Sequence, residues 1–277
     1  MADVLVASHS EGLSEIFARS FSVVRADTHA LRDALYRLRY QVYCIENQFE
    51  NPADFPDGRE TDAYDAAALH AALIHKTSES VIGGVRLIPP GPSSLPIRKV
   101  IGYDENRILD AFPPEHSAEI SRYTVSRVFR RRVGEVQYAD TELHNWANPA
   151  EHRRILPNIT LGLMRAILGF CAESDIRYLF ATMAPALLRL LDGFGLHFER
   201  LGSCVHFHGL RQPCYASYAD LLAGLRRHRT DFYDVVRSAF DRERAELPRL
   251  DPQPPRLPVL TVIAGGRRSR AATGIVD

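Results

Sequence analysis

The sequence predicts an α+β fold with a central mixed sheet flanked by helices and with added helices at the C-terminus. Strand patterns come in runs separated by turn-forming residues, helical patterns stand between and after these runs, and the two do not alternate strictly. Runs of strands indicate hairpins, whereas intervening helices indicate crossover connections. The sheet is therefore expected to contain both antiparallel and parallel strand pairs.

Composition indicates a soluble, folded chain without a global charge bias. Hydrophobic residues make up 45% of the 277 positions and charged residues 25%, as in ordinary folded domains. The basic and acidic residues number 34 each, which argues against attraction of the whole chain to nucleic acid or an anionic membrane. The N-terminus lacks the pattern of a secretory signal, and no apolar run reaches bilayer length. We expect a cytoplasmic protein with reduced cysteines and at most peripheral membrane contact.

The first predicted element is an amphipathic helix over residues 27–46. Its apolar residues recur at alternating intervals of four and three, and Asp27 or Thr28 stands at the N-cap position. A second stripe with the same spacing places Arg39 and Tyr43 one turn apart, near the buried edge of the helix.

A long ordered loop or lid and a β-hairpin are expected next. Residues 47–65 combine prolines, a glycine and several acidic residues, a composition typical of a loop. Two apolar runs on either side of a turn-prone segment predict strands at 68–76 and 81–88. Gly83 and Gly84 indicate a bulge or a close approach of another backbone.

The second half continues the mixed pattern. The expected elements are a strand over 118–127, an apolar helix entered through Pro157, a strand over 177–183, a helix from Pro185, and two short strands within 196–209. We expect an N-terminal extension over residues 1–24 and one domain over 25–215. A helical extension over 216–249 and a mobile tail over 250–277 follow.

Charged residues recur at intervals inside or beside the apolar stretches. Such residues cost free energy unless they are paired or used, so a repeated series of them indicates a site. The series consists of Arg39, Asp62, Asp65, Arg86, Glu119 and Arg122.

Five segments carry a resemblance to a known family. They are LRYQVY at 38–43, Phe49, ETDAYD at 60–65, VIGGVRLIPP at 81–90 and EISRYTV at 119–125. Over about residues 30–216 the chain resembles the acyl-homoserine-lactone autoinducer synthases and the related N-acyl amino acid synthases, which have a GNAT-like acyltransferase fold. Its length, its arginine-rich segment and its C-terminal helices look most like the acyltransferases associated with PEP-CTERM and exosortase systems.

The resemblance implies roles for individual residues. Glu119 and Arg122 take the catalytic positions, and the substrate-binding positions are those of Arg39, Tyr43, Phe49, Asp62, Asp65 and Arg86. Autoinducer synthases typically have Phe and Trp where this chain has Tyr43 and Phe49. That departure bears on whether the product is a homoserine lactone.

The chemistry of joining an acyl thioester to an amine fits these residue types. The acceptor's ammonium needs a base, for which we choose Glu119, acting directly or through a water. Arg122 and Arg86 either anchor ligand groups or lock carboxylates in place. Asp62 and Asp65 are expected to orient Arg39 and to hold the lid.

Glu119 and Arg122 raise a geometric question. Positions three apart in a regular strand face opposite sides of the sheet, so the two side chains can share a site only if the strand is irregular. We therefore predict a β-bulge between Ser121 and Val125, as a GNAT-like fold is expected to have.

The acyl donor is expected to be acyl carrier protein or, alternatively, coenzyme A, with no tightly bound cofactor and no metal. The phosphate-binding loop of GNAT enzymes is half present, since Arg131 and Gly134 match and Val136 does not. An acidic carrier protein would suit the basic cluster of Arg127, Arg130, Arg131, Arg132, Arg153 and Arg154. A solvated basic turn is the alternative interpretation of that cluster.

Other interpretations stay open at this level. Asp62 and Asp65 can be loop caps, and Glu119 and Arg122 can form structural ion pairs. The alternating Cys204, His206 and His208 suggest a zinc site, but ordinary strand residues are the preferred interpretation. The leading function is an N-acyltransferase acting on the amine of an amino acid or related molecule. The alternatives are a homoserine-lactone synthase that uses S-adenosylmethionine and a non-catalytic module that senses acyl carriers.

Overall fold

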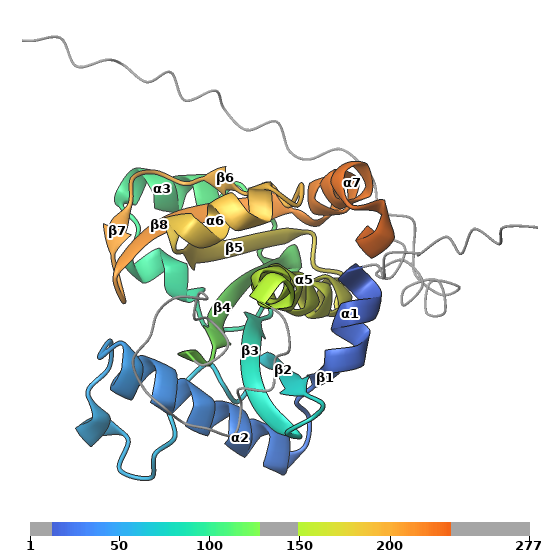
Figure 1. Cartoon of the computed structure of the whole chain (residues 1–277). Coiled ribbons are helices and arrows are strands. Elements are labelled where there is room, and N and C mark those ends of the chain that lie inside the picture. Colours follow the sequence, from blue (N-terminus) through green and yellow to red (C-terminus); the bar gives the residue numbers. More distant parts are fainter. Residues whose placement is uncertain (1–12, 128–148, 234–277) are drawn as a thin grey trace, which may run out of the picture.

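A mixed sheet organises the computed structural model, which describes residues 13–127 and 149–233. Seven of its eight strands follow the order β1-β2-β3-β4-β5-β8-β6 (Figure 1). The eighth, β7, lies off this path and pairs with β8. All paired strands are antiparallel except β4 and β5. This arrangement confirms the predicted α+β class and the mixed sheet.

The N-terminal segment belongs to the sheet. Helix α1 (Leu13–Ser20) leads into β1 (Phe21–Arg25), which pairs along its whole length with β2 (Leu69–His75). The boundary expected at residue 24 therefore falls inside an edge strand. The predicted hairpin is present, since β2 turns back into β3 (Ser80–Ile88).

The predicted helix over residues 27–46 is confirmed and has two parts. Helix α2 (His29–Tyr40) continues directly as the π-helix η1 (Gln41–Glu46). Of the two candidate caps, Thr28 is the one used, because its hydroxyl oxygen accepts a hydrogen bond from the backbone N–H of Leu31 at 3.3 Å.

Two faces of the sheet carry different layers. Ala71 and Leu73 on β2 belong to the main core, which lies under α5 (Pro149–Glu173). Ala72, between them, points to the other face and packs with Leu35 of α2. Since side chains alternate along a strand, α5 and α2 cover opposite faces (Figure 1).

The face under α2 continues toward a second apolar cluster. Short segments cross it between β3 and β4: η3 (Pro96–Lys99), α3 (Tyr103–Leu109) and η4 (Pro114–His116). They bury Phe112 and Ile97 against β5. The 3-10 turn η2 (Pro52–Asp54) lies earlier, in the loop predicted over residues 47–65.

Strand β4 (Ser117–Val125) joins two halves of the sheet. On one side it pairs in parallel with β5 (Tyr178–Met183), which it reaches through the crossover containing α5. This parallel pairing covers only Ser117–Ile120, so the second half of β4 does not pair with β5.

The predicted bulge is confirmed on the other side of β4. Arg86 of β3 is opposite Ser121 and Gly84 is opposite Thr124, so one residue of β3 faces two residues of β4. One of these two, Arg122, has a left-handed φ of 49°. Because of the extra residue, Ser121 and Arg122 face the same side of the sheet, and the side chains alternate regularly again from Tyr123 onward.

The C-terminal part adds more strands than the sequence predicted. Helix α6 (Pro185–Asp192) precedes two short strands, β6 (Glu199–Arg200) and β7 (Val205–His206). Strand β8 (Leu210–Ser217) was not predicted, and the boundary expected at residue 215 lies within it. Helix α7 (Tyr218–His228) packs on β8 and contributes to the main core. Residues 234–249 of the segment expected to be helical over 216–249, and the tail after it, lie outside the described residues.

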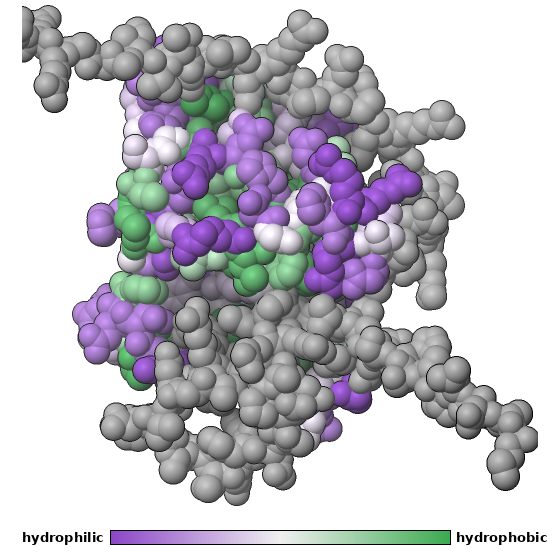
Figure 2. Space-filling view, turned by 45° about the horizontal axis from the view of Figure 1, so that its top comes forward, coloured by the Kyte–Doolittle hydropathy of each residue, from purple (hydrophilic) through white to green (hydrophobic). Residues whose placement is uncertain are grey.

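The surface shown in Figure 2 carries hydrophobic side chains in small patches separated by hydrophilic ones. Among the described residues, no helix combines the length and the apolar character needed to cross a membrane.

Candidate active site

Three arginines and three carboxylates form a buried ionic network on the α2 side of the sheet. They come from α2, from the loop after it, and from two neighbouring strands, so the network joins distant parts of the sequence. Its members are Arg39, Glu60, Asp62, Asp65, Arg86 and Arg122.

Arg39 binds the loop to the helix. Its Nε donates to Glu60 Oε2 at 2.5 Å, and its two terminal nitrogens donate to the two oxygens of Asp65 at 2.7 and 3.0 Å. Both carboxylates are almost fully buried with it. Asp65 therefore orients Arg39 as expected, whereas Asp62 does not contact it.

Arg86 is fully buried in the network, with 1% of its side chain exposed. Its Nε donates to Ser121 Oγ at 2.9 Å, and Nη1 donates to Asp62 and Asp65, both at 2.6 Å. A further bond joins Nη2 to Asp62 at 2.9 Å. Of the two roles considered from the sequence, the geometry matches the locking of carboxylates.

Arg122 lies at the edge of the network. Its Nη2 is 2.8 Å from Glu60 Oε1 and 3.1 Å from Asp62 Oδ2, and its guanidinium carbon lies 5.2 Å from the centre of the Tyr43 ring. The side chains of Arg122 and Asp62 are 12% and 27% exposed, more than the other members. The network therefore meets solvent at these two residues.

Glu60 is the network member that the sequence did not single out. It accepts hydrogen bonds from Arg39 and Arg122, which precede and follow it by 21 and 62 positions. It lies in the ETDAYD segment, so the only signal available was its place in a motif.

The network is electrically balanced, with three positive and three negative side chains. Burial by itself raises the pKa of Asp65, but the hydrogen bonds and charges of Arg39 and Arg86 hold that pKa well below its usual range. The pKa values of Glu60 and Asp62 are lowered in the same way, against the effect of burial. These carboxylates stay ionised at neutral pH.

Glu119 is a buried carboxyl that is not a member of the ionic network. It is 4% exposed, and its Oε2 accepts a hydrogen bond from the backbone N–H of Ile97 at 2.7 Å. No ion pair joins it to any residue that the structure describes. Burial raises its pKa to about 8, because neither the Ile97 hydrogen bond nor the charges of Arg86 and Arg122 compensate for lost hydration.

Glu119 and the network share one face of β4. Alternation places Glu119 and Ser121 on the face under α2, and the bulge keeps Arg122 there. The next residue, Tyr123, then points to the opposite face, where its hydroxyl lies 2.8 Å from Thr160 of α5. The condition set by the sequence for a shared site is met.

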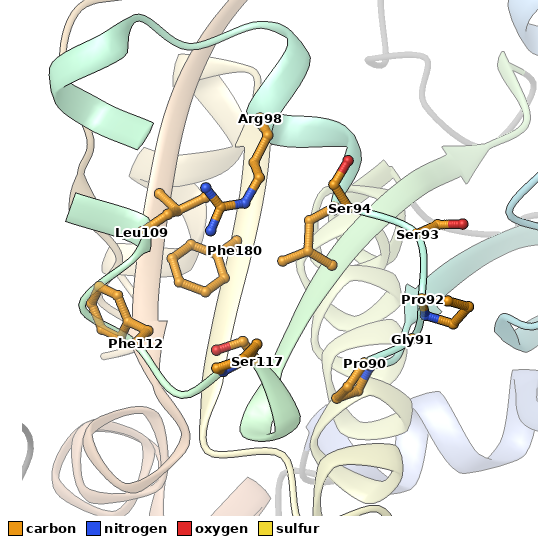
Figure 3. A pocket seen from close by; sticks show the side chains of 12 residues that line it. Pro90, Gly91, Pro92, Ser93, Ser94, Arg98, Leu109, Phe112, Ser117 and Phe180 are labelled. Carbon is orange, nitrogen blue, oxygen red and sulfur yellow. The ribbon is translucent and has the colours of Figure 1, made fainter. Parts of the chain in front are cut away.

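A pocket of about 230 Å³ opens next to the start of β4 (Figure 3). Ser117, two residues before Glu119 on β4, lines it, and so does Phe180, which pairs in register with Glu119. Leu109 and Phe112 give it apolar walls. Glu119 is therefore adjacent, along β4 and across to β5, to residues that line this pocket.

Tyr43 and Phe49 meet a residue that the sequence did not assign to the site. Their ring centres are 6.0 Å apart, and each lies 5.7 Å from the imidazole of His208. His208 lies in the turn between β7 and β8 and was interpreted as an ordinary strand residue. No local sequence pattern indicates its contacts with Tyr43 and Phe49, because the fold brings these distant residues together.

The candidate residues for carrier docking fall largely outside the description. Arg130, Arg131 and Arg132 lie in the segment that the structure does not describe, as do Gly134 and Val136 of the half-matched phosphate loop. Arg153 and Arg154 lie in α5, but their side chains are also outside the described part.

Metal ligation was considered for the alternating residues near β7. Cys204 Sγ donates to Gln212 at 3.3 Å, and His206 is exposed. Within residues 13–127 and 149–233, no group of three or more His, Cys, Asp or Glu side chains is placed to hold a metal ion.

Comparison with known proteins identifies the fold. Residues 38–138 match the family described as acetyltransferase (GNAT) domain. No curated protein matches the sequence. Together, the matched segment and the mixed sheet with its bulged β4 show a GNAT-like fold.

Several solved structures resemble the chain at low sequence identity. TofI, in a ternary complex with an inhibitor and MTA, has a TM-score of 0.50 and 18% identity, covering 74% of this chain and 96% of its own. The CoA-dependent acyl-homoserine lactone synthase BjaI has a TM-score of 0.49 and 22% identity over 84% of this chain and 95% of its own. FeeM, an N-acyl amino acid synthase from uncultured soil microbes, has a TM-score of 0.48 and 18% identity over 74% and 93%.

Proposed function

We propose that the protein is an N-acyltransferase that moves a fatty acyl group from acyl carrier protein, or from acyl-CoA, to the amine of an amino acid or a related small molecule. The observation that carries this proposal is Glu119, a buried carboxyl with a pKa of about 8 that forms no ion pair with any residue in the described ranges. It lies on the bulged strand β4 of a GNAT-like fold.

The raised pKa suits the proton transfer that the reaction needs. The ammonium form of the acceptor must lose a proton before its nitrogen can attack a thioester. Ionised Glu119 takes up that proton directly or through a water, and its pKa of about 8 lies near the pH at which a general base is most efficient. The nitrogen then bonds to the acyl carbon, the carbon–sulfur bond breaks, and the thiol leaves with a proton.

The ionic network serves the site by holding its shape. Arg39 and Arg86 place their hydrogen bonds on Glu60, Asp62, Asp65 and Ser121, so we assign them to support of the loop and the strand. Arg122 is the network's partly exposed cation, and we assign it to the carboxylate of the acceptor.

The acyl donor and the cellular context of the protein are further parts of this proposal. The carrier-protein donor and the association with exosortase systems are proposed from the family resemblance, and the cytoplasmic location is an expectation from the sequence. The absence of a tightly bound cofactor belongs with them, because the thioester itself supplies the activated acyl group.

An assay with defined donors tests the function. Purified protein is incubated with acyl carrier protein or coenzyme A thioesters and a panel of amino acids that includes S-adenosylmethionine, and products are identified by mass spectrometry. We expect an N-acyl amino acid, with a loss of at least ~100-fold in rate for Glu119→Gln. Glu115→Gln, an exposed carboxyl on η4, is the matched control and keeps the wild-type rate.

Each other outcome identifies a different function. Release of methylthioadenosine with a lactone product indicates a homoserine-lactone synthase. Binding of acyl thioesters without turnover indicates a sensing module. Wild-type turnover by Glu119→Gln contradicts the assigned base.

A further inference from the structure

The turn between β7 and β8 directs a histidine toward the candidate active site. His208 and Gly209 have left-handed φ values of 51° and 87°, and the turn is closed by a hydrogen bond from Phe207 N to Gly209 O at 2.9 Å. The side chain of His208 is only 15% exposed, although its neighbours on both sides are exposed. The turn geometry therefore turns this one side chain inward.

His208 contacts one residue of the π-helix η1 and two residues of the segment that follows it. Its Nε2 lies 2.8 Å from Glu50 Oε1, its ring stacks on Phe49 with 24° between the planes, and it meets the Tyr43 ring edge-on at 86°. One imidazole thus combines a polar contact and two ring contacts with residues 43–50.

The segment is also folded on itself. The carbonyl of Tyr43 accepts hydrogen bonds from the backbone N–H groups of Phe49 at 2.8 Å and Glu50 at 3.3 Å. A shift of Glu50 would therefore also move Tyr43. The contact between His208 and Glu50 thus helps to fix the position of the Tyr43 ring.

Two arginines enclose the same rings. The guanidinium of Arg122 lies over Tyr43 at 5.2 Å, and that of Arg211, on β8, lies over Phe49 at 5.5 Å. The Tyr43 ring is thus the physical link between the His208 contacts and the one partly exposed cation of the ionic network.

The surroundings of His208 favour its neutral form. Burial is the largest cause that lowers its pKa, Arg122 and Arg211 act in the same direction, and Glu50 opposes them. Neutral imidazole with its proton on Nε2 still donates to the Glu50 carboxylate. The contact therefore does not require a charged histidine at the pH of an assay.

We propose that His208 is a positioning residue that fastens residues 43–50 against the β7–β8 turn and so sets Tyr43 and Phe49 beside Arg122 for binding of the amine acceptor. The proposal rests on the proposed function and extends it. It assigns the specificity for the acceptor to a contact between two segments about 160 positions apart in the sequence, which the GNAT fold brings together.

The central variant is His208→Asn. Asparagine tolerates left-handed backbone, so the turn is retained, but it lacks the ring and the reach of the imidazole. His206→Asn is the matched control, because His206 is exposed and two positions away on the same hairpin. Glu50→Ala removes the partner from the other side.

Steady-state kinetics separate positioning from a general structural role. For His208→Asn we expect the acceptor KM to rise about tenfold, equivalent to ~1.4 kcal/mol, while kcat and the donor KM stay within about twofold. Glu50→Ala behaves similarly, and the double variant is no worse than the stronger single one, because both remove the same contact. His206→Asn matches the wild type.

Hydrogen exchange of residues 43–50 gives a readout that does not need turnover. We expect faster exchange there in His208→Asn and unchanged exchange in His206→Asn. Unchanged exchange in His208→Asn overturns the proposed fastening, whatever the kinetics. Faster exchange with an unchanged acceptor KM overturns the positioning role. If the wild type transfers no acyl group at all, the proposed function fails and the positioning role fails with it, while the exchange result still decides whether the contact fastens the segment.

Discussion

Glu119 and Arg122 face the same side of β4 although they are three positions apart, because Arg122 adopts a left-handed conformation within a β-bulge. In a regular strand one of them would lie in the core under α5. The bulge instead places the buried carboxyl of Glu119 on the same face as a neutral ionic network. This relationship makes the candidate site possible, and the network around it can be tested separately from the chemistry.

The buried network should be far more important for stability than a surface ion pair. Arg86→Met leaves Asp62 and Asp65 without a shared cation, and we expect a loss of about 3–5 kcal/mol in the free energy of unfolding. Arg37→Met is the control, because its pair with Asp33 is exposed, and it should cost less than ~1 kcal/mol. Urea denaturation measures both, and equal costs would show that the network is not a structural unit.

Acid should weaken the fold through the same carboxylates. Asp65 has a folded-state pKa below its usual value of 3.8, so its stabilisation is fully present above about pH 4 and is lost as the pH falls below that value. Asp65→Asn should lower stability at pH 7 and flatten its decline toward pH 3. Denaturation curves at several pH values check this, with the exposed Asp54→Asn as a control that keeps the wild-type slope.

Gly84 should tolerate no side chain because α2 approaches the sheet there. A Cβ at this position would overlap Leu35 Cδ2 and stand 3.1 Å from the carbonyl oxygen of Ala71. We expect Gly84→Ala to cost about 1–3 kcal/mol, with partial recovery in combination with Leu35→Ala. Gly169→Ala, in open space within α5, should instead be neutral or stabilising by up to ~1 kcal/mol. Thermal unfolding distinguishes these outcomes.

Glu119 should reduce stability as the pH rises. Its folded-state pKa of about 8 exceeds the ordinary value of 4.5, so the native state holds a proton that the unfolded state releases. Between these two values, wild-type stability should fall by up to about 1.4 kcal/mol per pH unit from this group. Glu119→Gln removes the effect, so the variant should become increasingly more stable than the wild type toward pH 8. A constant difference between the two across this range would contradict the raised pKa.

Local patterns made much of the fold predictable. The helix over residues 27–46 was found because its apolar spacing and its Thr28 cap are local in sequence, and the bulge in β4 was inferred because Glu119 and Arg122 needed a common face. Strand β8 was missed because its LRQPCYAS sequence contains polar residues and a proline, and its pairing with β5 is set by tertiary structure.

The site was predictable in its residue types and less so in its contacts. Glu60 was overlooked because its partners are 21 and 62 positions away, and no sequence spacing reports such a contact. The side chain of His208 points inward because His208 and Gly209 adopt left-handed backbone conformations. The alternation of Cys204, His206 and His208 in the sequence does not indicate this turn. Asp62 was assigned to Arg39, but the fold brings it to Arg86 and Arg122 instead.

The pH dependence of acyl transfer by the wild type and by Glu119→Gln tests the central proposal most directly. With a fixed thioester and a responsive amine, we expect the wild-type kcat/KM to rise through an ionisation near pH 8, and the variant to be slower by at least ~100-fold at every pH. A variant as fast as the wild type, or a wild-type profile that is already flat above pH 5, would contradict the assignment of Glu119 as the base.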